Sequence, residues 1–324
     1  MEHCFITQLK PGQMVEQDFL IVRKSLSPFK NASKGNYLAL VLADKTGQIQ
    51  ARMWENADAF HEKASENKVY FIKGRVEKYN NFMQIKVDDL YPLEDAQFDA
   101  ATYLAASTRP LPEMRAELRT ILEKVQHPGL KEFFCEWLLD SDFAASYSYS
   151  PAAKQIHHAY VAGLLEHSLE VAKFALAVHE LYPEADRDIL IIAALLHDIG
   201  KVSEYVCGLG IDITDQGRLI GHTVIGYNML QERAAGDARV PADKLTHIGH
   251  ILLSHHGELM YGAPVMPSTL EAVIVHHADL TSGRVRQFTR ALNEFAPEED
   301  WLFEKNLGRM IYRGFVENGS GATE

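Results

Sequence analysis

Residues 190–201 read Leu-Ile-Ile-Ala-Ala-Leu-Leu-His-Asp-Ile-Gly-Lys, and the fold of the second half of the chain depends on them. The residues from Ile189 to Leu196 are all apolar, and the lack of period-2 alternation together with two alanines favours a helix. A helix that is apolar on every side must be buried on every side. His197 and Asp198 follow it directly, and both are costly to bury without partners. A metal ion would satisfy both side chains, although a helix end open to solvent is the simpler explanation for a single His-Asp pair.

Four other segments with helical periodicity carry His or Asp in line with their apolar residues. The inward-facing residues are His167, His222, His255 and Asp279, and His256 lies about 100° further round its helix. Histidine is concentrated in this part of the chain, where 12 of the 15 lie between His157 and His277. Each residue alone is more often an ordinary core or surface residue. Five successive helices with ligand-type side chains facing inward, however, predict a metal site.

The N-terminal part has the pattern of a small β-barrel. Five strand-like runs occupy residues 19–23, 37–42, 48–54, 69–76 and 82–87, with a short helical segment at Ala57–Ala64 after the third. Five short strands with a helix between the third and fourth match the order of an OB-fold. Residues 42–54 resemble the turn between strands 2 and 3 of nucleic-acid-binding OB modules.

Basic and aromatic residues on these strands predict a surface for single-stranded RNA, because aromatic rings stack on bases and basic groups follow the phosphates. The candidates are Arg52, Trp54, Lys73, Arg75, Tyr79, Phe82 and Lys86. Two other interpretations stay open. In the first, Trp54 and Phe71 belong to the barrel core and the charged residues form a solvated face. In the second, the barrel is a protein-contact module.

Composition limits the function classes. The 44 Asp and Glu residues exceed the 32 Lys and Arg residues, for a net charge of −12, and the excess of acid lies entirely after residue 96. This charge argues against tight, indiscriminate binding to duplex DNA. Apolar runs stay below the ~18 residues of a membrane span, so no membrane contact is expected. The N-terminus lacks the pattern of a signal peptide, and three isolated cysteines predict reduced thiols in a cytoplasmic protein.

We expect four segments along the chain: an OB-fold at residues 1–95, a helical connector at 96–150, a helical domain at 151–316, and a disordered tail at 317–324. The connector pattern predicts helices at Leu111–Val125 and Leu130–Leu139 and a loop at Ser146–Pro151. In the helical domain, helices are predicted near residues 156–179, 187–201, 222–234, 243–255, 268–295 and 301–312.

The order His…His-Asp…His…His-His…Asp, with Lys three residues after the first Asp, resembles the HD superfamily of metal-dependent phosphohydrolases. The resemblance covers about residues 152–295. The expected fold class is therefore multidomain α+β, an N-terminal five-stranded OB-fold β-barrel followed by an all-α HD domain. The resemblance implies one metal held by His167, His197, Asp198 and Asp279, and a second held by Asp198, His222 and His255. His256 either completes the second site or binds the phosphate.

The whole layout resembles a narrower group, the YhaM-type bacterial 3′→5′ exoribonucleases. The resemblance rests on the OB-fold, the connector, the HD core and the segments at residues 157–167 and 255–264. It implies removal of nucleotides from the 3′ end of single-stranded RNA, with single-stranded DNA as a further substrate in some members, and a divalent metal such as Mn²⁺ or Co²⁺. It makes His158 a candidate substrate contact. Gly163 stands where some HD proteins have a Glu that helps to bind a third metal, so a third metal is not expected.

The chemistry also fits the residues themselves. Two metals can activate water and offset the charge of a phosphodiester. Mixed His and carboxylate ligands suit Mn, Fe, Co, Ni or Zn better than Mg, and we favour Mn. Lys201 is either a catalytic cation for a phosphate oxygen or a solvated helix end. Arg284 and Arg286 are candidates for gripping the phosphate chain.

Two other functions stay open. One is a nucleotide or cyclic-nucleotide phosphohydrolase that uses the barrel for oligomerisation, and the other is a non-catalytic RNA-binding protein whose HD core is only structural. A homo-oligomer is compatible with each of these functions.

Overall fold

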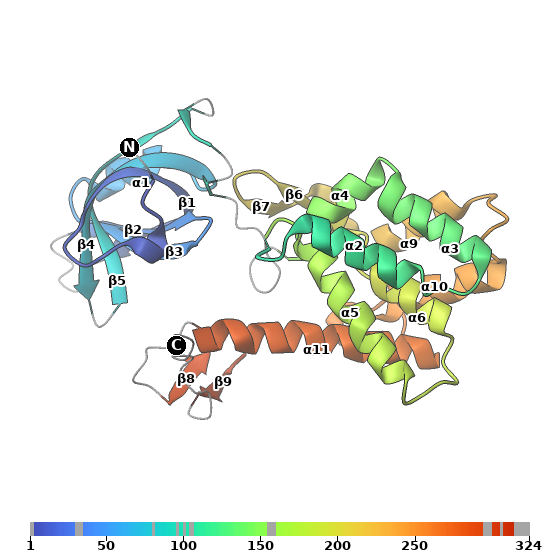
Figure 1. The fold of residues 1–324 in the computed structure, drawn as a ribbon. Coiled ribbons are helices and arrows are strands. Elements are labelled where there is room, and N and C mark those ends of the chain that lie inside the picture. The colour runs from blue at the N-terminus through green and yellow to red at the C-terminus, as the bar shows by residue number, and fades with distance from the viewer. Residues whose placement is uncertain are drawn as a thin grey trace, which may run out of the picture.

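The computed structural model of the protein describes residues 3–29, 35–79, 82–94, 97–99, 102–103, 107–153, 160–293, 300–304 and 307–313. The first part of the chain forms a β-barrel and the second part a body of helices (Figure 1). The predicted tail at residues 317–324 lies outside the described residues.

The barrel has the five predicted strands. They are β1 (Met14–Pro28), β2 (Asn36–Asp44), β3 (Gly47–Met53), β4 (Lys68–Tyr79) and β5 (Phe82–Pro92), with α1 (Ala57–Lys63) between β3 and β4. The strands close in the order β1-β2-β3-β5-β4, and β3 pairs with β5 in parallel. Alternate residues of β3, Ile49, Ala51 and Met53, are buried in the barrel core. The predicted OB-fold is confirmed.

A charge cluster ties the segment before β1, which includes the short helix η1 (Ile6–Gln8), to the barrel. The imidazole of His3 lies 3.7 Å from the Asp18 carboxylate and 3.6 Å from the Asp44 carboxylate. Tyr103 donates its hydroxyl to Asp18. Burial alone would lower the pKa of His3, but the two carboxylates outweigh burial and raise the pKa to about 9. His3 is therefore charged in the folded protein at neutral pH.

This cluster predicts a pH-dependent loss of stability in the His3→Gln variant. Histidine ordinarily titrates near 6.5, so the ion pair stabilises the fold fully below that pH and stops doing so as the pH rises through about 9. We expect His3→Gln to lower the free energy of unfolding by up to about 3 kcal/mol at roughly pH 6, and by much less at roughly pH 10. Urea denaturation of both proteins at the two pH values measures this. An equal difference at both would contradict the assignment.

The rest of the chain is mainly helical. Its helices are α2 (Leu111–Leu122), α3 (Pro128–Cys135), the π-helix η5 (Glu136–Asp140), α4 (Phe143–Tyr149), α5 (Gly163–His179), α6 (Arg187–Leu196), α7 (Lys201–Glu204), α8 (Asp215–Ile220), α9 (His222–Ala234), α10 (Ala242–Ser254), the 3-10 helix η6 (Leu259–Tyr261) and α11 (Leu270–Asn293). Two hairpins, β6–β7 (Tyr205–Cys207, Ile211–Ile213) and β8–β9 (Trp301–Glu304, Arg309–Tyr312), add short strands that the prediction of an all-α domain did not include.

Helix α6 belongs to the largest hydrophobic cluster, as its uninterrupted apolar run predicts. The Asp186 side chain accepts hydrogen bonds from the backbone N–H groups of Asp188 and Ile189 and so caps the helix. Nine of the ten residues of α6 are buried. The eight apolar ones, residues 189–196, share one cluster with residues of α5, α10 and α11, and with α2 and α3 from the predicted connector. Because α6 is enclosed in this way, the residue that follows it, His197, is held in a fixed place.

Some predicted boundaries and one predicted element are wrong. The helix expected from Ile156 begins at Gly163, since residues 160–162 are not helical, and the loop expected at Ser146–Pro151 is helical as far as Tyr149. The segment 301–312, predicted as a helix, contains the two strands of the β8–β9 hairpin. Leu302 and Ile311 pack on the end of α11, whereas their neighbours in the strands are more exposed, which is the period-2 pattern of a strand.

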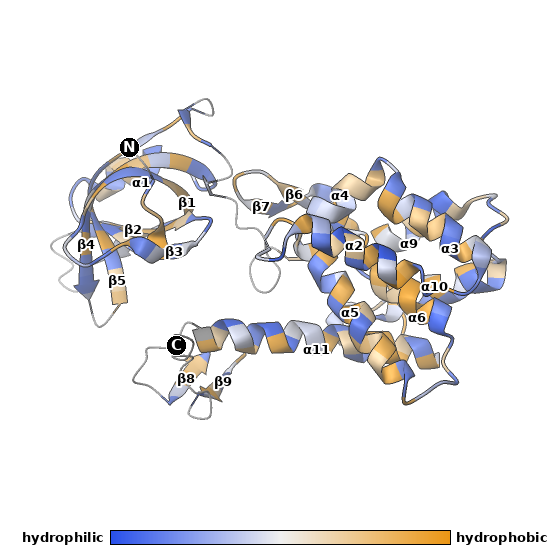
Figure 2. Cartoon of the chain, in the orientation of Figure 1, coloured by the Kyte–Doolittle hydropathy of each residue, from blue (hydrophilic) through white to orange (hydrophobic). Residues whose placement is uncertain are grey.

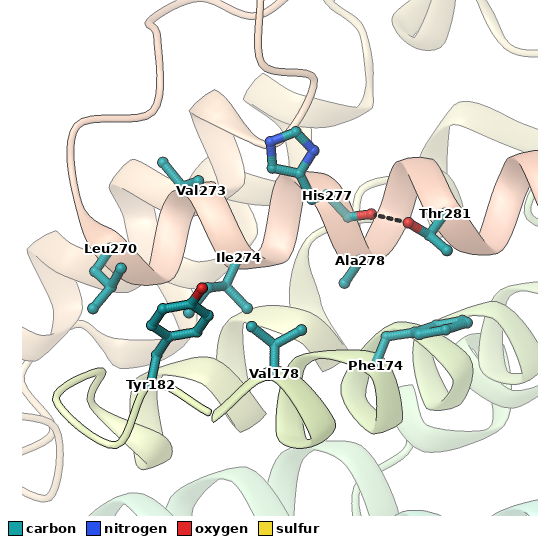
Figure 3. A pocket seen from close by; sticks show the side chains of 9 residues that line it. All are labelled: Phe174, Val178, Tyr182, Leu270, Val273, Ile274, His277, Ala278 and Thr281. Atoms are coloured by element: carbon teal, nitrogen blue, oxygen red, sulfur yellow. Dashed lines mark hydrogen bonds between the residues drawn. The ribbon is translucent and has the colours of Figure 1, made fainter. Parts of the chain in front are cut away.

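Helix α11 alternates hydrophilic and hydrophobic residues along its length (Figure 2). Part of its apolar side borders a groove of about 320 Å³ between α5 and α11. In Figure 3, Phe174, Val178 and Tyr182 face Ile274 and Ala278 across this groove. None of the predicted metal ligands lines it. Each helix of the described residues is too short or too polar to cross a lipid bilayer.

Candidate metal centre

The fold brings all seven predicted ligand side chains into one cluster. The first group is His167 on α5, His197 after α6 and Asp279 on α11, whose ligand atoms all lie within 4.8 Å of one another. His167 Nε2 is 3.2 Å from His197 Nε2 and 3.1 Å from Asp279 Oδ1. His167 and His197 are buried, so the group lies within the helical body.

The second group consists of His222, His255 and His256, whose ligand atoms also lie within 4.8 Å of one another. His222 is the first residue of α9, while His255 and His256 follow α10. The Nε2 atoms of His222 and His256 are 3.2 Å apart. His256, whose role the sequence left open, therefore lies with the second group.

Asp198 lies between the two groups and offers one carboxylate oxygen to each. Its Oδ2 is 3.4 Å from His167 Nε2 and 3.3 Å from His197 Nε2. Its Oδ1 is 3.3 Å from His222 Nε2 and 3.6 Å from His255 Nε2. A carboxylate in this position can bridge two cations, one in each group.

The orientation of the rings fits metal binding. All five imidazoles direct Nδ1 to an acceptor outside the cluster: Ala194 O for His197, Leu252 O for His255, Tyr261 O for His256, the Glu204 carboxylate for His222 and the Ser282 hydroxyl for His167. Carbonyl and carboxylate oxygens only accept, so Nδ1 carries the proton and Nε2 presents its lone pair to the cluster. His255 Nε2 is buried and has no hydrogen-bond partner. Converging lone pairs about 3 Å apart, with one buried and unpaired, are the donor set of a metal site.

The charges of three imidazoles point the same way. Burial lowers the pKa of His167 and His255, and burial together with His255 lowers the pKa of His256 to about 4, which favours the neutral form that binds metals. Burial alone would also lower the pKa of His197, but the Asp198 and Asp279 carboxylates outweigh burial and raise it. Burial alone would raise the pKa of Asp198, but Lys201 and His197 outweigh it and hold the pKa well below the usual range. Asp198 is therefore ionised, which is the form that can bind a metal.

Two residues that orient these ligands were not predicted from the sequence. Glu204 accepts from the backbone N–H and from Nδ1 of His222, both at 3.2 Å. The Ser282 hydroxyl accepts from His167 Nδ1 at 3.2 Å and donates to Glu170 at 2.8 Å. Ser282 lies three residues after Asp279, on the same side of α11, and that spacing was the only available signal.

The predicted substrate contacts fall in different places. Lys201 donates to Asp198 Oδ2 at 2.6 Å, so it lies at the centre of the cluster. Arg286 pairs with Glu166 and Glu170, so its guanidinium is already engaged by two carboxylates. Arg284 is exposed and contacts Gln287. His158 lies outside the described residues.

The outer face of the barrel carries the predicted basic and aromatic residues. The register places Arg52 of β3 beside Lys86 of β5, and Lys86 beside Arg75 of β4, so three cations form one row across the sheet. The Arg52 guanidinium lies 5.5 to 5.9 Å from the ring centroids of Tyr37, Trp54 and Tyr79. Tyr37 was not predicted, and Phe82 is exposed at the start of β5. Cations among open aromatic rings are the elements of a single-strand-binding face.

Comparison with protein families agrees with this geometry. The family model described as HD domain matches residues 164–283, which include all seven clustered ligands. The chain contains an HD domain. A second model, described as OB-fold nucleic acid binding domain, matches residues 21–93 in the barrel. The HD domain thus carries the metal-ligand cluster, and the OB domain carries the row of cations.

Several curated proteins match this chain along nearly their whole length. The 3′-5′ exoribonuclease YhaM of Bacillus velezensis is 29% identical over 289 residues, which cover 89% of this chain and 90% of that protein. The YhaM protein of Listeria welshimeri is 29% identical over 294 residues, with 89% and 91% covered. That of a Geobacillus strain is 27% identical over 313 residues, with 96% and 94% covered. The similarity therefore extends across the HD domain, the OB domain and the helices between them.

Proposed function

We propose that this protein is a metal-dependent 3′→5′ exoribonuclease that hydrolyses phosphodiester bonds of single-stranded RNA at a dinuclear site in the HD domain. The observation that supports this best is the Asp198 carboxylate, which turns one oxygen to each of two groups of imidazole nitrogens. The YhaM relatives, similar along almost the whole chain, point to RNA as the substrate and to its 3′ end as the site of attack.

In this proposal one metal is held by His167, His197, Asp198 and Asp279, and the other by Asp198, His222, His255 and His256. Two bound divalent ions would supply positive charge for the scissile phosphate and activate water for attack. The protein's own part is to keep His167, His255 and His256 neutral, to fix the orientation of the rings through Nδ1, and to hold Asp198 ionised. Lys201 contributes to the last of these, because its ammonium donates to the bridging carboxylate. Mixed His and Asp ligands suit Mn, Fe, Co, Ni and Zn, and among these we favour Mn because the resemblance to the YhaM-type exoribonucleases implies it.

The OB domain would capture the strand and lead its 3′ end to the HD domain. Arg52, Lys86 and Arg75 would follow successive phosphates, while Tyr37, Trp54 and Tyr79 stack on bases. This face of the barrel favours a nuclease over a nucleotide or cyclic-nucleotide phosphohydrolase, which has no use for a strand-binding surface. The orientation of five histidines about one aspartate favours an enzyme over a non-catalytic RNA-binding protein.

The test of this function is a cleavage ladder. A single-stranded RNA labelled at its 5′ end is incubated with the protein and Mn²⁺, and we expect successively shorter labelled products, none of which form in EDTA. Single-stranded DNA of the same sequence tests the range of substrates. No shortening of RNA, together with release of phosphate from mononucleotides, would support the phosphohydrolase instead. A capture of RNA with no cleavage of any kind would support the non-catalytic function.

The Trp54→Ala variant tests whether the barrel contributes to RNA binding. Trp54 packs against Tyr37 with 4.9 Å between ring centroids and lies beside Arg52, so its loss removes one stacking surface from the face. We expect the affinity for a long single-stranded RNA to fall about tenfold, while the cleavage rate of a dinucleotide stays unchanged. Trp301→Ala is the matched control, since Trp301 is an exposed tryptophan of the C-terminal β8–β9 hairpin. Equal losses on both substrates would contradict a role of the barrel as RNA guide.

Two further properties belong to this proposal. Cys4, Cys135 and Cys207 are all free thiols, which agrees with a protein that acts in the reducing cytoplasm. A homo-oligomer stays a prediction, and light scattering of the purified protein tests it.

A further inference from the structure

Two short segments next to the metal-ligand cluster expose large apolar side chains. Leu219 and Ile220 end α8, and Leu259, Met260 and Tyr261 form η6. Leu219 is 85% exposed, Met260 81% and Tyr261 65%, and the first two are the most exposed large apolar side chains among the described residues. We call these five residues the apolar rim.

The chain places both halves of the apolar rim close to the cluster. Ile220 is two residues before His222, and Tyr261 is five residues after His256, whose Nδ1 donates to the Tyr261 carbonyl at 3.0 Å. The Nε2 atoms of these two histidines are only 3.2 Å apart. Since consecutive Cα atoms are about 3.8 Å apart, the α8 half of the rim lies within about 11 Å of His222 along the chain. The rim therefore belongs to the surroundings of the second group of ligands.

We propose that the apolar rim binds the base of the 3′-terminal nucleotide while its phosphodiester lies at the metal-ligand cluster. This inference rests on the proposed function and adds a subsite to it. A phosphodiester at the cluster carries a ribose and a base with it, and the base face is the large apolar part of a nucleotide. The tyrosine ring offers it a stacking surface, and the Leu, Ile and Met side chains offer apolar contact.

The chemistry of the rim also indicates what it does not recognise. Arg218, next to Leu219, pairs with Asp212, and Lys201 pairs with Asp198, so both cations are occupied by carboxylates. The Leu and Ile side chains have no hydrogen-bonding groups, and the Met sulfur is only a weak acceptor, so these residues do not discriminate between base edges. The Tyr261 hydroxyl is the one strong hydrogen-bonding group among the rim's side chains, and its ring is assigned to stacking. The rim thus binds the face of the base and accepts all four bases with similar affinity. Such a subsite suits an enzyme that removes nucleotides one after another whatever the sequence.

The experiment compares two substrates on three forms of the enzyme. One substrate is a short single-stranded oligoribonucleotide, and the other is the same strand with an abasic ribose at its 3′ end. We expect wild-type kcat/KM to fall about tenfold on the abasic strand. Tyr261→Ala should lose about tenfold on the ordinary strand and nothing further on the abasic one, whereas Tyr261→Phe keeps the ring and behaves as wild type. Because the contact to His256 uses the backbone of Tyr261, the bound Mn²⁺ per chain should be unchanged in both variants.

Further variants separate the rim from its alternatives. Met260→Ala should repeat the pattern of Tyr261→Ala, and Leu181→Ala, an equally exposed apolar residue beyond the far end of α5, should leave both substrates unaffected. If the wild-type enzyme shortens the ordinary and the abasic strand equally fast, the rim does not bind the 3′-terminal base, but the proposed exoribonuclease function is unaffected. Tyr261→Ala has one further outcome that overturns the proposal. If the variant changes the oligomeric state, and its kcat/KM still falls about tenfold when the 3′ base is missing, the rim contacts a second copy of the chain and not the base. A wild-type protein that shortens neither strand overturns the proposed function itself.

Discussion

Replacing Asp198 with asparagine is expected to reduce exoribonuclease activity by at least about 10³-fold and to reduce the bound Mn²⁺ from two ions per chain to one or none. The Asp198 carboxylate lies within 4 Å of four of the five clustered imidazoles, and each of its oxygens serves a different group. Asparagine has nearly the same volume, but it offers one neutral oxygen in place of a carboxylate. It cannot bridge two cations, so the second ion loses a charged ligand.

The fold should survive this change. Asparagine fills the same buried space, but it leaves the Lys201 ammonium, which is only 12% exposed, without its carboxylate partner, so we expect a folded protein with a lower melting temperature than wild type in EDTA. Elemental analysis of the purified protein gives the metal content, and the RNA ladder gives the activity. Asp140→Asn is the control, since Asp140 is an exposed aspartate paired with Arg119 far from the cluster. An Asp198→Asn variant that retained two ions and full activity would remove the basis of the proposed function.

The position of the metal-ligand cluster was predictable because its residues break local rules. His and Asp side chains on otherwise apolar helix faces need an explanation, and α6, apolar all round, could only be central. The barrel was predictable for a similar reason, since period-2 alternation and turn residues are local signals. Residues 301–312 show where hydrophobic periodicity fails to distinguish a strand from a helix. The strands β8 and β9 are only four residues each, too short for their alternation to be distinguished from a helical pattern.

The residues that orient the ligands could not be predicted in this way. Glu204 is 18 positions from His222, and Ser282 is 115 positions from His167. Glu and Ser are common on helices, and at both positions the sequence predicts a solvent-exposed side chain. Only the packing of α7 against α9 and of α11 against α5 makes them partners of the histidines, and this packing is a property of the whole fold.

Gly200→Ala is expected to destabilise the HD domain by about 3 kcal/mol and to weaken the second group of ligands. A Cβ atom on Gly200 would lie 2.0 Å from the backbone oxygen of His222 and 2.6 Å from the backbone nitrogen of Gly226. Both contacts are with the backbone of α9, so no side chain can move to make room. Helix α9 itself must shift, and His222 moves with it.

The number of metal ions bound by Gly200→Ala shows whether the packing of α9 positions the second group of ligands. The shift of α9 displaces His222 but not His167, His197 or Asp279. Gly200→Ala should therefore lose the Mn²⁺ of the second group and retain the ion of the first. Isothermal titration calorimetry would show this as half the wild-type number of Mn²⁺ ions bound per chain. The matched control is Gly208→Ala in the nearby β6–β7 hairpin, where the added Cβ meets nothing closer than 4.0 Å and stability should change by less than about 0.5 kcal/mol. If Gly200→Ala unfolded at the same urea concentration as wild type, the close approach of Gly200 to the backbone of α9 would be wrong. The glycine of the His197-Asp198-Ile-Gly-Lys201 stretch would then have no structural role at the site.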